Sequence, residues 1–149
     1  MSSKASDIAL VVAGRIADIT VANGYNTDIG LRVYRGRMSL NTKDLPCAVI
    51  VEEADSVLET KGTKVRVKQR YIIEGHDNCD PEQPNDKAHE ILQDIKKAIF
   101  GGDLSFDGAL RPNDIEYAGR SISAREDGTS ICAASVDIDV TFVEELTDP

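Results

Sequence analysis

The spacing of hydrophobic residues near the start of the chain predicts an amphipathic helix. Ser6 is a suitable N-terminal cap, and the helix is expected to continue to about Asn23. Four residues at helical spacing form its apolar face, namely Ile8, Val12, Ile16 and Ile19. Gly24 then supplies the left-handed backbone conformation that ends many helices. This element is therefore expected to bury one face against the rest of the protein.

A second helix is predicted after Pro84, with Asn85 as its cap and Gly101-Gly102 at its end. Its apolar residues recur at the same helical spacing: Ala88, Ile91, Leu92, Ile95 and Ile99. Lys96 and Lys97 stand near its C-terminus, where positive charge interacts favourably with the helix dipole. This helix is also expected to bury one face.

Five segments have the apolar character of strands, and they cover residues 29–37, 45–52, 64–74, 115–124 and 130–143. Residues 64–74 alternate most clearly, with Val65, Val67, Tyr71 and Ile73 on one face and Lys64, Arg66, Lys68 and Arg70 on the other. In the last segment Cys132, Ala134, Val136, Ile138, Val140 and Phe142 share a face. Polar connections at residues 38–44 and 55–63, and a turn at Asp127-Gly128, separate the strands.

The element order predicts an α+β fold. A helix, three strands, a second helix and a two-strand hairpin follow one another, and short connections between strands favour a mainly antiparallel sheet with both helices packed on it. A chain of 149 residues has the common length of one domain, so residues 1–149 are interpreted as a single unit.

Charge and composition exclude several classes of function. The net charge of −9 argues against a surface that grips nucleic acid phosphates, and the absence of Trp argues against large stacking platforms. Three widely spaced cysteines and an N-terminus without an apolar signal segment indicate a reducing cytoplasm. No stretch approaches the roughly 20 apolar residues of a membrane-spanning helix.

The residues with metal-binding or catalytic potential do not form a recognisable site. His76-Asp77-Asn78-Cys79-Asp80 is the densest group, but a zinc site needs further ligands that His89 and Cys132 are not placed to supply. We interpret this group as a polar loop between a strand and a helix. Cys47 and Cys132 lie in apolar strand patterns, where cysteine usually acts as a small hydrophobic residue. The sequence thus predicts no enzyme activity, cofactor or metal.

A basic strand stands out in this acidic chain. Lys61, Lys64, Arg66, Lys68 and Arg70 place five of the 17 basic residues within ten positions. One interpretation is a solvated strand face whose charges prevent aggregation at the sheet edge. The other is that this face meets an acidic face of another copy, formed by Asp137 and Asp139 or by Glu144-Glu145. Such head-to-tail contacts close into rings when the rotation allows it.

Several segments together resemble the tail terminator (tail completion) proteins of long-tailed bacteriophages. The resemblance begins with the helix that ends in Ala22-Asn23-Gly24-Tyr25-Asn26-Thr27-Asp28-Ile29-Gly30. It continues through Val33-Tyr34-Arg35-Gly36-Arg37 and Leu45-Pro46-Cys47-Ala48-Val49-Ile50-Val51. The helix from Ala88 to Phe100, the segment Gly119-Arg120-Ser121-Ile122 and a final strand ending near Val143 complete it. These motifs are structural and cover most of the chain in order.

The resemblance implies a mixed α/β fold that assembles as a hexameric ring on the head-proximal end of the tail tube. Such a ring stops tube polymerisation and presents a surface to the neck. The implied partners are other copies of the chain, the tail tube protein and a neck or head-completion protein. DNA would pass through the lumen without specific binding, since an acidic lining repels it. The implied location is the tail of the virion, after synthesis in the host cytoplasm.

The residues expected at ring or tube contacts are Arg35, Arg37, Lys61, Lys64, Arg66, Lys68 and Arg70. Gly24, Tyr25 and Gly30 are expected to have structural roles, with Tyr25 packing back onto the last helical turn and the strand. Two alternatives stay open: a head-to-tail connector or other neck completion protein, and a small cytoplasmic metal-binding protein or enzyme.

Overall fold

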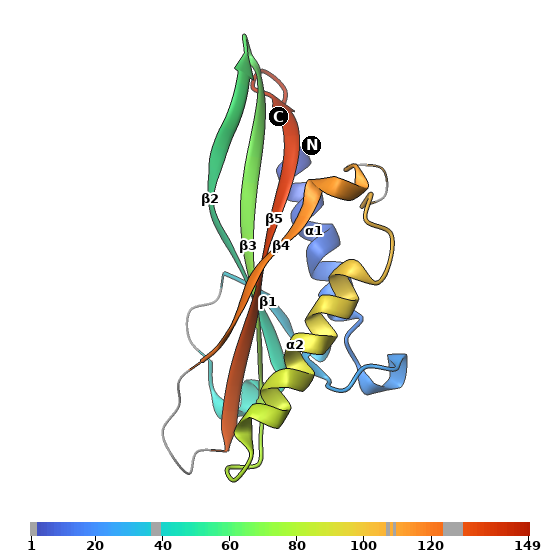
Figure 1. The fold of residues 1–149 in the computed structure, drawn as a ribbon, viewed down its shortest axis with the longest axis vertical. Helices are drawn as coiled ribbons and strands as arrows, with labels where there is room; N and C mark the ends of the chain where they lie inside the picture. The colour runs from blue at the N-terminus through green and yellow to red at the C-terminus, as the bar shows by residue number, and fades with distance from the viewer. Residues whose placement is uncertain (1–2, 37–39, 107, 109, 124–129) are drawn as a thin grey trace.

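The computed structural model describes residues 3–36, 40–106, 108, 110–123 and 130–149. Within them, a five-stranded sheet has the strand order β1-β2-β3-β5-β4 (Figure 1). The strands are β1 (Val33–Arg35), β2 (Cys47–Lys61), β3 (Lys64–Asn78), β4 (Ile115–Ile122) and β5 (Ile131–Glu145). Only β1 and β2 pair in parallel, and every other neighbouring pair is antiparallel.

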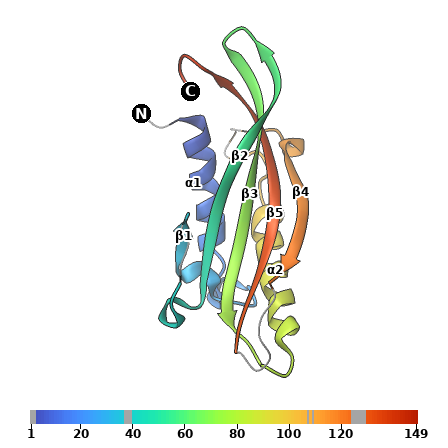
Figure 2. The same ribbon diagram turned by 90° about the vertical axis from the view of Figure 1, so that its left-hand side faces the viewer.

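Two helices, α1 (Lys4–Ala17) and α2 (Pro84–Phe100), cover one face of this sheet (Figure 2). The order of elements is the predicted one: a helix, three strands, a helix and a two-strand hairpin. The α+β fold with a mainly antiparallel sheet is therefore confirmed. In the described connections lie four short 3-10 helices: η1 (Val21–Asn23), η2 (Ile29–Leu31), η3 (Thr42–Asp44) and η4 (Pro112–Asp114).

The first helix is shorter than predicted and begins earlier. Its N-cap is Ser3, whose hydroxyl accepts a hydrogen bond from the Ser6 backbone N–H at 3.1 Å, so Ser6 is not the cap. The helix ends at Ala17, although Ile19 is fully buried just beyond it. Gly24 has the expected left-handed conformation, with φ +90°, but it caps η1 rather than α1.

The predicted polar loop at residues 55–63 is wrong, because β2 continues to Lys61. Residues 52–61 are all exposed, so they lack the alternation of a half-buried strand. Their pairing with β3 makes them a strand, and Gly62, at φ +61°, turns the chain into β3. The opposite error occurs earlier, since residues 29–31 form η2 and, of the described part of the predicted first strand, Val33–Arg35 alone pairs as a strand.

The hydrophobic core fills the space between the helices and the sheet. The predicted faces of α1 and α2 contribute Ile8, Val12, Ile16, Ile91, Leu92, Ile95 and Ile99, all of them buried. The faces predicted for β3 and β5 are also buried, including Val67, Tyr71, Ile73, Val136 and Ile138. Gly75 lets α2 approach closely, since a Cβ there would stand 2.4 Å from Cγ2 of Ile91.

The sheet extends past the helices at one end. Figures 1 and 2 show the β2-β3 hairpin projecting beyond the N-terminal end of α1, with β5 beside it. β1 covers only Ala48 to Ile50 of β2, and β4 reaches only Val140 of β5. We call this part of the sheet, made of residues 52–61, 64–70 and 139–145, the distal end. It contains most of the predicted contact residues.

Candidate interaction surface

Four basic side chains of β3 lie along one side of the distal end. Val65 and Val67 belong to the buried core, whereas Lys64 and Arg66, on the opposite face, are exposed. Lys68 and Arg70 follow on that opposite face and are partly covered. The alternation predicted from the sequence thus separates an apolar face from a basic one. The register places Asp139 of β5 directly opposite Arg70.

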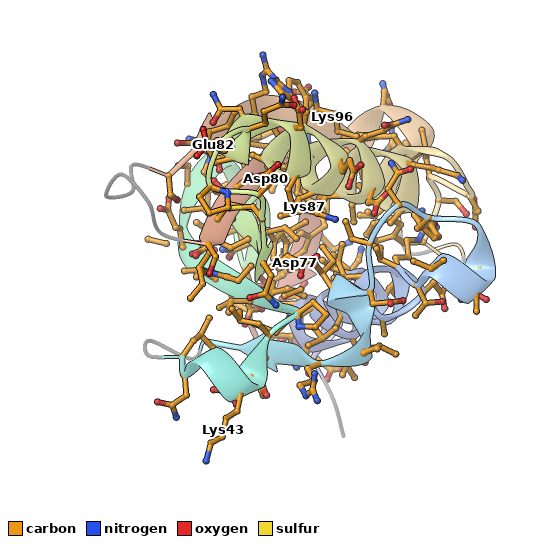
Figure 3. The ribbon with its side chains drawn as sticks, turned by 90° about the horizontal axis from the view of Figure 1, so that it is seen from below. Lys43, Asp77, Asp80, Glu82, Lys87 and Lys96 are labelled. Atoms are coloured by element: carbon orange, nitrogen blue, oxygen red, sulfur yellow. The ribbon has the colours of Figure 1, made fainter. Side chains whose placement is uncertain are left out.

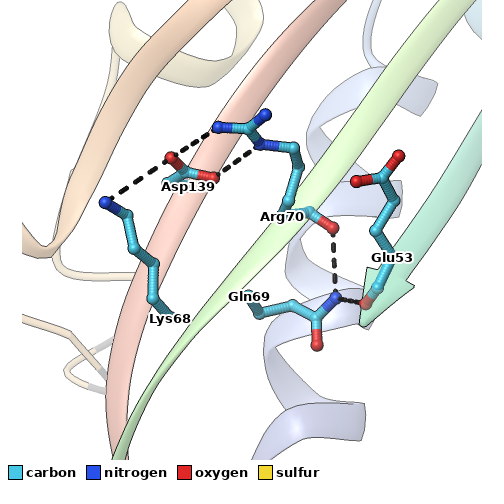
Figure 4. A network of polar contacts seen from close by, with 5 residues as sticks. All are labelled: Glu53, Lys68, Gln69, Arg70 and Asp139. Atoms are coloured by element: carbon cyan, nitrogen blue, oxygen red, sulfur yellow. Dashed lines mark hydrogen bonds and ion pairs between the residues drawn. The ribbon is translucent and has the colours of Figure 1, made fainter. Parts of the chain in front are cut away.

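Asp139 forms an ion pair with Arg70 within the same chain (Figure 4). The Arg70 guanidinium donates two hydrogen bonds to this carboxylate, at 2.9 and 3.1 Å, and the ammonium of Lys68 lies 3.8 Å away. The hydrogen bonds and charge of Arg70 lower the pKa of Asp139. The Asp139 carboxylate is thus paired within its own chain, and only 9% of the side chain is exposed. It is not a free acidic group for a second copy.

Gln69, which precedes Arg70, ties the base of the β2-β3 hairpin together. Its side-chain amide donates to the backbone carbonyl of Glu53 on β2 and, at 3.1 Å, to that of Arg70 (Figure 4). These contacts span the bulge in β2 where the ladder shifts between Glu52 and Asp55. A polar concavity, which includes Glu53, Ser56 and Lys68, lies beside this bulge. The hairpin is therefore cross-linked at its base, while its outer strand remains exposed.

The remaining predicted contact residues occupy different surroundings. Arg35, at the end of β1, pairs with Glu52 at 3.3 Å, and Lys61, beside the turn, pairs with Glu59 at 3.4 Å. Lys64 stands opposite both Lys61 and Glu145 in the ladder. Arg37 lies outside the described residues. The structure thus gathers Lys61, Lys64, Arg66, Lys68 and Arg70 at the distal end and places Arg35 apart from them, on β1.

Arg66 has two basic neighbours that the sequence analysis did not find. A groove at the outer edge of β5 is lined by Lys4 of α1, Arg66 of β3 and Arg111 before η4. The Lys4 ammonium donates to the carbonyl of Val143 at 3.2 Å. No sequence signal connects these residues, because the three positions are far apart in the chain and meet only when α1 and the segment before η4 pack beside β5.

The group from His76 to Asp80 lies at the opposite end of the molecule (Figure 3). Its first three residues belong to β3, so the interpretation of the whole group as a loop is wrong. His76 contacts Glu74 at 3.1 Å, and the buried thiols of Cys79 and Cys132 lie next to each other. Burial, together with Cys79, raises the pKa of Cys132 to about 12. In the part of the chain that the structure describes, no cluster of three or more such side chains is arranged to hold a metal ion.

Comparisons with known proteins gave no relative: no protein-family model matches the chain, and no curated protein matches it. Among the described residues, neither helix has the length and apolar character required to cross a bilayer.

The segment from Asn23 to Gly30 has a structural role. Gly30 lies against the end of α1, where an added Cβ would stand 2.5 Å from the carbonyl oxygen of Ile16 and 2.6 Å from that of Ile19. Tyr25 is half-buried, and the ammonium of Lys97 on α2 lies 4.7 Å from the centre of its ring. Tyr25 thus has a contact with the second helix that the sequence analysis did not predict.

Proposed function

We propose that the protein is a tail terminator: a homo-oligomeric ring that caps the head-proximal end of a bacteriophage tail tube. The capped tube stops growing, and the exposed side of the ring receives the neck. A small single domain suits this task. A ring repeats the same modest contact between each pair of neighbouring copies, so all of these contacts together hold the assembly. The hexameric state comes from the resemblance.

The observation that carries the proposal is the order of elements. The segments that resemble tail terminators fall on a single α+β domain, in which they form the junction after α1, the buried start of β2, helix α2 and the strands β4 and β5. The segment from Asn23 to Gly30, which begins the resemblance, is packed between α1 and α2. Its residues therefore stabilise the fold, and the contacts with other copies and with the tube are expected on other surfaces of the domain.

The distal end offers a surface of the required kind. It projects past the helices and presents exposed apolar residues, with Val57, Leu58 and Val143 at 62%, 49% and 45% exposure. Exposed apolar side chains surrounded by charges are typical of protein contact sites. The net charge of −9 also suits a ring through which DNA moves without binding.

Electron microscopy of the purified protein mixed with tail tubes tests this proposal. We expect rings on one end of each tube and tube lengths that no longer increase when tube protein is added. Bare tube ends, on tubes that keep growing when tube protein is added, would contradict the proposal. A Lys43→Glu variant is a suitable control for the effect of changing a surface charge away from the proposed contacts. This exposed residue lies in η3, remote from the distal end (Figure 3).

A further inference from the structure

The distal half of β2 has an open outer edge. β1 pairs only with Ala48, Val49 and Ile50, and no other described strand lies on this side of β2. Ten consecutive residues, from Glu52 to Lys61, are exposed. Ladder shifts next to Glu52 and next to Val57 interrupt the regular pairing with β3. Bulges and charges of this kind prevent indiscriminate pairing of an edge, so contact here requires a matching partner.

The edge is acidic, with an apolar centre. It contains Glu52, Glu53, Asp55 and Glu59, and its two large apolar residues are Val57 and Leu58. Glu53 and Asp55 form no ion pair within the described residues. The edge carries four carboxylates against one basic residue, Lys61. It is therefore complementary to a positively charged surface.

The opposite edge of the distal end provides a positive surface. Beyond Val140, where pairing with β4 stops, β5 borders a groove of about 230 Å³. Lys4, Arg66 and Arg111 line it, and neither arginine forms an ion pair within the described residues. Asp114 is the acidic residue of the groove, and its carboxylate already accepts the backbone N–H of Arg111 at 3.1 Å. Uncompensated positive charge thus stands beside the exposed Val143.

We propose that the acidic edge of β2 docks into the basic groove beside β5 of a second copy. The two surfaces lie on opposite edges of one sheet end, so each copy can use both at once. Contacts between two different surfaces continue from copy to copy and close into a ring at the right rotation. Glu53 and Asp55 would meet Arg66 and Arg111, with Val57 and Leu58 packing near Val143. This inference rests on the proposed ring and names its interface.

Charge reversal tests the interface. One variant carries Glu53→Lys and Asp55→Lys, which makes both edges basic. The other carries Arg66→Glu and Arg111→Glu, which makes both edges acidic. Light scattering coupled to size exclusion gives the mass over a range of concentrations. Each variant alone is expected to assemble at a concentration about tenfold higher or more than the wild type.

Mixing the two variants separates the interface from general damage. In an equimolar mixture every contact joins an acidic edge of one variant to a basic edge of the other, so assembly should return to the wild-type range. Lys43→Glu, which reverses one charge outside both surfaces, should leave the mass unchanged. Circular dichroism melting verifies that each variant is folded.

Three results would overturn the inference: a wild-type protein that stays monomeric, reversed variants of unchanged mass, or a mixture that does not recover. The tube-capping experiment is independent of these results. If the masses respond but tubes remain uncapped, the interface stands and the proposed function fails. If tubes are capped but the masses do not respond, the function stands and this interface fails.

Discussion

The carboxylate of Asp94 on α2 accepts hydrogen bonds from both the hydroxyl and the backbone N–H of Thr27, at 2.7 and 2.8 Å. The backbone N–H of Asn26 adds a third, at 3.0 Å. Asp94 and Thr27 are 1% and 2% exposed, so these bonds are shielded from water. A buried carboxylate is costly unless hydrogen-bond donors surround it, and Asn26 and Thr27 supply those donors to Asp94. Asp94 on α2 thereby holds the segment that follows η1 in place.

Thr27→Val removes one of these donors and is expected to lower the free energy of unfolding by about 1–2 kcal/mol. Asp94→Ala leaves several buried donors without an acceptor and should cost more, about 3 kcal/mol. Urea unfolding followed by circular dichroism measures both. Gln93→Ala is the matched control, because Gln93 accepts an exposed hydrogen bond from Asn26 and its loss should change stability by less than about 0.5 kcal/mol. Equal losses for Gln93→Ala and Thr27→Val would contradict the buried network.

Two glycines near α1 should respond to alanine in opposite directions. At Gly30 a Cβ would overlap carbonyl oxygens of the α1 end, so Gly30→Ala should destabilise the fold by about 2 kcal/mol or more. At Gly14 an added Cβ meets nothing within 4 Å, and alanine is a better residue in a helix interior. Gly14→Ala should therefore raise stability by about 0.5–1 kcal/mol. The melting temperatures of the two variants measure these changes. A Gly30→Ala variant as stable as the wild type would show that the packing against α1 is loose.

Asp139 should make the protein sensitive to acid. Its pKa is lowered from 3.8, first by the hydrogen bonds of Arg70, so the folded state binds this proton more weakly than the unfolded chain. The stabilisation is therefore present above pH 3.8 and is lost as the pH falls through the lower folded value. Asp139→Asn should cost about 1 kcal/mol at neutral pH, a modest value because Arg70 is 41% exposed.

The same variant should show a weaker fall of melting temperature than the wild type when the pH is lowered from about 5 to 3. Asp137→Asn is the comparison, since Asp137 lies on the same strand face but forms no ion pair within the described residues. If both variants kept the full acid dependence of the wild type, the Arg70 contact would not contribute to it.

Tyr25 should stabilise the junction between η1 and α2. Its ring packs against the core and lies beneath the ammonium of Lys97, so Tyr25→Ala is expected to cost about 1–2 kcal/mol. Tyr25→Phe keeps the ring and should retain most of this stability. The melting temperatures of the two variants provide the measurement, and an unchanged value for Tyr25→Ala would argue against the packing.

The sequence was most informative where one face of an element is buried and the other is not. The alternation around Val65 and Tyr71 placed β3 correctly, and the spacing around Ile91 and Ile95 placed α2. Residues 53–61 were missed, because a strand exposed on both faces has no hydrophobic pattern and is held only by its neighbour. Ile19 misled in the other direction, since it continues the helical spacing and is buried without being helical.

The candidate surface was only partly predictable for a related reason. Lys64, Arg66, Lys68 and Arg70 share a face by simple alternation, which sequence alone reveals. The pairing of Arg70 with Asp139 depends on the register between two strands that are far apart in the chain. Lys4 and Arg111 join Arg66 only after α1 and η4 have been placed against β5. Such relationships arise from tertiary packing and leave no local pattern.

The position of β5 has a consequence for biosynthesis. β5 is the last strand in the chain, yet it lies between β3 and β4 and pairs with β3 over the whole length from Lys64 to Asn78. During translation β3 has only β2 as a partner strand, and its other edge stays unpaired until β5 leaves the ribosome. A nascent chain stalled in that interval exposes unpaired strand edges, which promote aggregation. Slow elongation late in the message, or a shortage of chaperones, should therefore reduce the soluble yield of this protein more than that of proteins whose central strands are made first.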